Sequence, residues 1–115
     1  MKGFFNYFTI VVLLLNAYFY RHDIPFDSNK WKNWAEKKAT INNRWDMRND
    51  LILNYGLVGM TQSEVVNLLG EPRESFKVKS EYIYFLGMAR FGIDTGSLTL
   101  KFKNGKVSEV IVWRG

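Results

Sequence analysis

The sequence predicts an α+β protein, with helices packed on one face of a three- to four-stranded antiparallel sheet and a membrane helix at the N-terminus. Three observations predict this fold. An uncharged apolar run opens the chain, segments of helical period follow, and residues of alternating polarity around an Asn-Gly turn close it. The 115 residues suffice for one domain. We divide them into an anchor or signal segment (1–21), a juxtamembrane linker with a helical extension (22–56) and an α+β domain (57–115).

The composition excludes several kinds of chemistry. The chain is 47% apolar, carries a net charge of +5, and contains no cysteine and one histidine. Without cysteine there is no disulfide, no thiolate metal site, no cysteine nucleophile and no lipid-modified cysteine. A single histidine argues against a zinc site. We therefore expect a protein that is not an enzyme and that uses no metal, cofactor or small-molecule substrate.

The segment Phe4–Tyr20 contains no charged residue and predicts a membrane helix. At about 1.5 Å per residue such a helix is roughly 25 Å long, close to the hydrocarbon thickness of about 30 Å. An uncleaved anchor is favoured because Leu15 and Ala17 make a poor signal-cleavage site. A cleaved signal and a buried soluble helix remain alternatives. The positive-inside rule favours a cytoplasmic domain, whereas a signal-like N-terminus exports the domain that follows it.

The linker and the basic segment after it allow three interpretations. His22–Asp27 is expected to be a short linker, with His22 at the membrane interface, and Ser28 is expected to cap a helix beginning near Asn29. The basic segment interleaves tryptophan with lysine, and its candidate membrane-surface residues are Lys30, Trp31, Lys32 and Trp34. The alternatives are a solvated basic helix with its tryptophans in the core, or a nucleic-acid interface. Nucleic acid is the least favoured partner, and we expect none.

A second helix is predicted over Asn42–Asn54, with Gly56 at its C-terminal end. Its candidate buried residues are Trp45, Leu51, Ile52 and Tyr55. Asp46 and Asp50 lie one turn apart and alternate with Arg44 and Arg48. That alternation favours helical ion pairs over a metal site.

A third helix is predicted over Gln62–Leu69. Thr61 and Glu64 have the spacing of a capping box. Gly70 suits the C-cap and Pro72 stops the helix. Each residue here has a structural role, and none is needed for chemistry.

The strands follow. Ser75–Lys79 is a possible strand, Glu81–Leu86 favours a strand, and Gly87–Gly96 is expected to be a loop. Ser97–Lys103 and Val107–Trp113 form a hairpin around Asn104-Gly105.

An uninterrupted hairpin register pairs Phe102 with Val107 and Leu100 with Glu109, and it places Glu109 on the apolar face. A bulge, an edge position or a partner cation would accommodate this carboxylate. A functional role for Glu109 is the alternative.

One short string matches a catalytic motif. Asp94-Thr95-Gly96-Ser97 has the D-T-G-S sequence of aspartic proteases, but too little chain follows it for that fold. A turn between strands explains the string better.

The C-terminal half resembles a known family. Gly59-Met60-Thr61, the helix with Val65 and Leu69, and the Gly70/Pro72 stop, followed by strands and a final hairpin, resemble the SmpA/OmlA (BamE-like) domain over about Leu57–Trp113. The resemblance implies an α+β fold and protein binding rather than catalysis, as in the similar architecture of β-lactamase inhibitor proteins. Members are mostly small envelope lipoproteins. This chain lacks their lipidated cysteine, and we expect Phe4–Tyr20 to take its place as the tether.

We therefore expect a non-enzymatic, membrane-tethered envelope protein with its domain on the extracytoplasmic side. Its partners would be another envelope or membrane protein and, through Phe4–Tyr20, the lipid bilayer. The expected working surface is the open face of the sheet with the 87–96 loop, and its candidate anchors are Tyr82, Tyr84, Met88, Arg90 and Phe91. An inhibitor or immunity-type protein that blocks an enzyme is the alternative.

Overall fold

The computed structural model describes residues 23–35, 41–72, 80–88 and 95–114. It confirms an α+β fold that consists of helices and a three-stranded antiparallel sheet. The described elements are α2 (Ser28–Lys32), α3 (Asn43–Asn54), α4 (Gln62–Leu69), β1 (Glu81–Met88), β2 (Thr95–Lys103) and β3 (Lys106–Arg114). The possible strand Ser75–Lys79, Asp94 and the segment Phe4–Tyr20 lie outside the described residues. Within the described ranges, no helix has the length and apolarity needed to cross a membrane.

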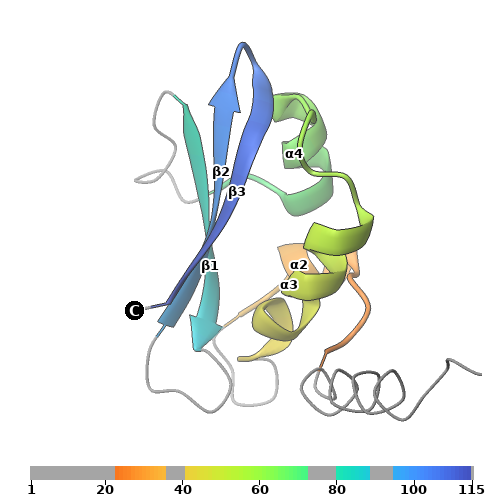
Figure 1. Cartoon of the computed structure of the whole chain (residues 1–115). Coiled ribbons are helices and arrows are strands. Elements are labelled where there is room, and N and C mark those ends of the chain that lie inside the picture. The colour runs from red at the N-terminus through yellow and green to blue at the C-terminus, as the bar shows by residue number, and fades with distance from the viewer. Residues whose placement is uncertain (1–22, 36–40, 73–79, 89–94, 115) are drawn as a thin grey trace, which may run out of the picture.

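The sheet is a meander in the order β1-β2-β3. The three helices lie together on one of its faces, and no described helix lies on the other face (Figure 1). β1 and β2 extend into the segment that we expected to be a loop, so that Thr95–Ser97 of the D-T-G-S string form the start of β2. The two tight-turn residues Asn104 and Gly105 have φ of 54° and 76°, as an Asn-Gly hairpin turn requires.

A bulge in β3 corrects the predicted hairpin register. Phe102 pairs with Val107 as expected, but Lys101 then pairs with Glu109 and Leu100 with Val110. The extra residue is Ser108, whose hydroxyl donates to the Lys101 carbonyl at 3.2 Å. Because a one-residue shift moves each later side chain to the opposite face, Glu109 is exposed rather than on the apolar face. The bulge therefore explains how β3 accommodates this carboxylate, as one of the predicted alternatives required.

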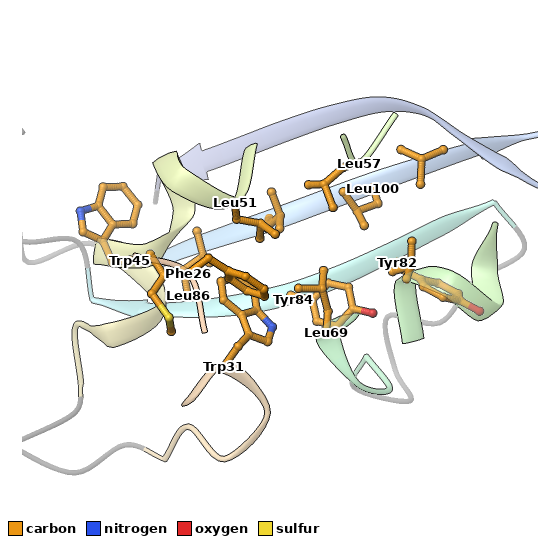
Figure 2. Close-up of a cluster of buried hydrophobic side chains, with 14 of the residues drawn as sticks. Phe26, Trp31, Trp45, Leu51, Leu57, Leu69, Tyr82, Tyr84, Leu86 and Leu100 are labelled. Carbon is orange, nitrogen blue, oxygen red and sulfur yellow. The ribbon is translucent and has the colours of Figure 1, made fainter. Parts of the chain in front are cut away.

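The core lies between the sheet and the helices. Its strand residues alternate along β1 and β2, and Trp31, Met47, Leu51 and Val65 of the helices are fully buried against them. Figure 2 shows the ring of Trp31 beside Phe26 and Tyr84 in this cluster. The buried strand residues are Tyr82, Tyr84, Leu86, Leu98, Leu100, Phe102 and Val107.

The segment before α2 is part of the packed domain, which corrects the predicted linker. Phe26 is 6% exposed, and its N–H donates to Asp50 Oδ2 at 2.7 Å. The N–H of Ile24 donates to the Asp46 carbonyl at 3.1 Å. Asp27, not Ser28, caps α2 by accepting from the Lys30 N–H at 3.0 Å. Ser28 is instead the first helical residue, and its hydroxyl donates to the Leu68 carbonyl.

The capping box before α4 is confirmed. Thr61 Oγ1 accepts from the Glu64 N–H at 3.2 Å, and Glu64 Oε1 accepts from the Thr61 N–H at 3.2 Å. These two bonds satisfy N–H groups that the first turn of a helix leaves without intrahelical partners. Gly70, at φ of 80°, is the C-cap, as predicted.

We expect Thr61→Ala to lower the free energy of unfolding by about 1 kcal/mol, the usual effect of losing a threonine N-cap. Denaturant unfolding followed by circular dichroism measures it. Ser63→Ala is the matched control, because Ser63 is exposed on the same helix and caps nothing in the described structure. Equal losses in the two variants would contradict the capping role.

Candidate protein-interaction surface

The face of the sheet opposite the helices carries apolar side chains. Antiparallel pairing places Ile83, Thr99 and Ile111 in one row across the three strands, and Phe85, Ser97 and Trp113 in the next. We call Ile83, Phe85, Ile111 and Trp113 the open-face patch. Trp113 is 57% exposed, whereas Ile83, Phe85 and Ile111 are half-buried. Thr99, at the centre of the sheet between Ile83 and Ile111, is only 4% exposed.

One end of the patch has a polar border. The next row across the sheet is Glu81, Lys101 and Glu109. Lys101 Nζ lies 4.0 Å from Glu81 Oε1, and both side chains are partly exposed. The apolar side chains thus lie on β1 and β3, on either side of Ser97 and Thr99 of the central strand, and charged residues border them at this end. Apolar residues with a polar rim are common at protein-binding surfaces.

The other end of the patch is bounded by Trp34. Its ring meets Phe85 edge-on, with the centroids 5.8 Å apart. The guanidinium of Arg44 stacks over Trp34 at 5.1 Å and over Trp31 at 5.0 Å. It also donates to the Phe85 carbonyl from Nη1 at 2.9 Å. Arg44 thus ties α3 to the edge of β1 next to the patch.

Two predicted anchors are not on this surface. Tyr82 and Tyr84 are 5% and 2% exposed, because these alternate residues of β1 point toward the helices. The Tyr84 hydroxyl donates to the Gly70 carbonyl at 2.8 Å, and burial raises the pKa of this phenol above its ordinary value. The backbone of Met88 ends β1, but its side chain, like the residues Arg90 and Phe91, lies outside the described residues.

The predicted membrane-surface residues also separate. Trp31 is 0% exposed and lies in the core. This agrees with the interpretation that places the tryptophans in the core, and it contradicts a position of Trp31 at the bilayer surface. Lys30 and Lys32 are exposed, and Lys32 Nζ donates to the Asn67 carbonyl at 2.6 Å. Trp34 is half-buried against Phe85 rather than displayed beside the lysines.

A groove of about 440 Å³ lies where the described chain begins. It is lined by Asp23, Ile24, Pro25, Asn49, Asp50, Leu53 and Asn54. Its polar residues are largely engaged with one another, since Asn49 Nδ2 donates to Asp23 at 3.0 Å and Asn54 Nδ2 donates to Asp50 at 2.7 Å. Across the described ranges, no three histidine or acidic side chains gather closely enough to hold a metal ion.

The Phe26 N–H and then the Asn54 amide hold the pKa of Asp50 below its ordinary value of 3.8. Because the folded pKa is depressed, this carboxylate stabilises the fold fully above the ordinary pKa, and the contribution is lost as the pH falls through the folded pKa. We expect an NMR titration to give Asp50 a pKa below 3.8. Asn54→Ala should raise it, and an unchanged pKa in that variant would contradict the second cause.

None of the four patch residues was predicted from the sequence. On β1 the prediction chose the face of Tyr82 and Tyr84 instead of the face of Ile83 and Phe85. On β3, alternation counted without the bulge puts Ile111 on the helix-covered face, whereas the bulge at Ser108 turns Ile111 and Trp113 to the open face. The signal was the carboxylate of Glu109, which an uninterrupted strand would have placed among apolar side chains.

Comparisons with family models, curated proteins and solved structures found no match for this chain. The resemblance of 57–113 to the SmpA/OmlA domain therefore stays a prediction.

Proposed function

We propose that this chain is a non-enzymatic, membrane-tethered protein of the cell envelope that binds another protein through the open-face patch. One observation carries the binding surface. The helices cover one face of the sheet, whereas on the opposite face Trp113 is 57% exposed and shares that face with Ile83, Phe85 and Ile111. Exposed apolar side chains rimmed by polar residues mark interaction sites, and tryptophan is among the residues enriched at the energetic centres of such sites.

The tether is a further part of the proposal. The uncharged segment Phe4–Tyr20 would lie in the bilayer as an uncleaved anchor, with the domain on the extracytoplasmic side. Packing of the domain begins almost at once after this segment, since Ile24 and Phe26 are already hydrogen-bonded to α3. Only a few residues would therefore separate the domain from the membrane surface, and the domain would lie near other membrane-bound proteins.

Site-specific photocrosslinking in native membranes tests the binding surface. A photoreactive residue replaces Trp113 in one variant and Leu53 in the control; Leu53 is 77% exposed on α3, which lies on the helix-covered face. We expect Trp113 to yield one reproducible adduct with a different protein, and we expect Leu53 to yield none. Adducts of the same proteins at both positions, or none at Trp113, would overturn the proposed surface.

The tether has its own test. The full-length chain should stay in the membrane pellet after alkaline extraction, and a chain beginning at Asp23 should not. A cysteine at exposed Gln62 should react with a membrane-impermeant reagent in intact spheroplasts, and the chain has no other cysteine to interfere. Labelling only after lysis would place the domain on the cytoplasmic side.

A further inference from the structure

A second groove, of about 280 Å³, is formed by α2, the residues directly after it and the start of α3. It lies on the helix side of the sheet, away from the open-face patch (Figure 1). Its volume is just below the usual range of about 300–1,000 Å³ for sites that take drug-sized ligands, so it has room for one small ring. We call it the amide groove, and the described residues that line it are Asn29, Lys30, Asn33, Trp34 and Asn43.

The polar side chains of the amide groove differ from those of the groove at Asp23. In that groove the asparagine amides are hydrogen-bonded to carboxylates. In the amide groove, no hydrogen bond or ion pair joins the side chains of the three asparagines or of Lys30 to other described residues. Each amide therefore offers two N–H donors and one carbonyl acceptor, and the ammonium offers three more donors. This mixture of donors and acceptors suits a ligand that carries several hydroxyl groups.

Trp34 supplies the apolar wall of the groove, and other residues hold its ring in place. The guanidinium of Arg44, which does not line the groove, lies 5.1 Å from the ring centroid, and Phe85 meets the ring edge-on at 5.8 Å. Gly87 leaves room for the ring, since a Cβ there would lie 2.9 Å from Trp34 Cζ2. A ring that is already ordered saves a ligand the entropy of ordering it. The C–H groups of a sugar ring carry slight positive charge, so they pack well on the negative face of such a ring.

The charge of the groove selects among ligands with hydroxyl groups. Lys30 is exposed and is the one charged residue among the described residues of the groove, so a ligand with a single negative group complements it. A nucleic-acid strand fits less well, because it presents a phosphate at every nucleotide and requires a groove with several cations.

We propose that the amide groove binds one uronic acid residue of an acidic polysaccharide. The sugar ring packs on Trp34, its carboxylate pairs with Lys30, and its hydroxyls exchange hydrogen bonds with the amides of Asn29, Asn33 and Asn43. This site lies on the helix side of the sheet and the proposed function concerns the opposite face, so either can fail alone.

Calorimetric titration of the detergent-solubilised full-length chain tests the site. The probes are trisaccharides of glucuronic, galacturonic and mannuronic acid, each compared with its carboxyl-reduced, neutral form. We expect at least one of the acids to bind roughly tenfold more tightly than its neutral form, because only the acid forms a charge-assisted hydrogen bond with Lys30. Added salt should weaken the binding of the acid more than that of the neutral form.

Two variants with a matched control identify the residues. Lys30→Gln should weaken binding of the acid by roughly the same factor and abolish the preference over the neutral form. Lys103→Gln, at an exposed lysine at the end of β2, should leave both unchanged. Asn29→Ala should weaken both forms equally, because both carry the hydroxyls that its amide would bind. Lys30 and Asn29 are exposed, so these variants should fold like the parent chain, which circular dichroism checks.

Three outcomes would overturn the proposal. They are the absence of binding by all three acids, equal effects of Lys30→Gln and Lys103→Gln, and tighter binding of single-stranded oligothymidylate than of any acid.

Discussion

Replacing Trp31 with alanine should lower the free energy of unfolding by about 3–5 kcal/mol, the range for large aromatic residues removed from a core. The Trp31 ring is fully buried, with its centroid 5.8 Å from that of Phe26 and 6.4 Å from that of Tyr84. The guanidinium of Arg44 lies over the same ring at 5.0 Å. Removing the indole would leave a cavity where α2, α3 and the sheet meet (Figure 2). Denaturant unfolding of the native and variant proteins measures the loss.

Two further variants separate packing from other effects. Among the described residues, the buried Trp31 Nε1 has no hydrogen-bond partner. Because contacts of the ring then hold the indole, Trp31→Phe should lower the free energy of unfolding less than Trp31→Ala does. Trp113→Ala removes the same side chain from the open face, where it is 57% exposed, and should cost only about 1 kcal/mol. Similar losses for the two alanine variants would show that Trp31 is not a core residue.

The elements with local signals were predicted well. The helix over Gln62–Leu69 was placed correctly because its capping box and glycine C-cap act within one or two turns. The Asn-Gly hairpin was correct for the same reason, since its turn depends on two residues. Such signals need no knowledge of what packs against them.

The residues of the candidate site were predicted less well, because their exposure depends on distant packing. Alternation along β1 shows that Tyr82 and Tyr84 share a face, but not whether the helices cover that face. Trp31 lies in a lysine-rich segment that looks superficial, yet α3 and β1 close over its ring. The bulge at Ser108 moved Ile111 and Trp113 to the open face by inserting one residue.

Gly87→Ala should be the second strongly destabilising change, because β1 and the segment before α3 approach closely there. A Cβ on Gly87 would lie 2.6 Å from the Ile41 carbonyl oxygen and 2.9 Å from Trp34 Cζ2. The carbonyl is backbone and cannot rotate away, so either the segment carrying Ile41 or strand β1 has to move. Moving Trp34 would also disturb its contact with Phe85, beside the open-face patch.

Gly105→Ala isolates this steric effect from the backbone effect. Gly105 has nearly the same dihedral angle, φ of 76° against 79° for Gly87, but nothing lies within 4 Å of its added Cβ. In both variants an alanine takes a left-handed backbone conformation, which lowers the free energy of unfolding by about 1–2 kcal/mol. Only Gly87→Ala also introduces a steric clash, which lowers it by about 1–3 kcal/mol more. Equal losses in denaturant unfolding would mean that the Ile41 segment does not close on β1. A larger loss for Gly87→Ala, with weaker crosslinking at Trp113, would show that this closure also shapes the open-face patch.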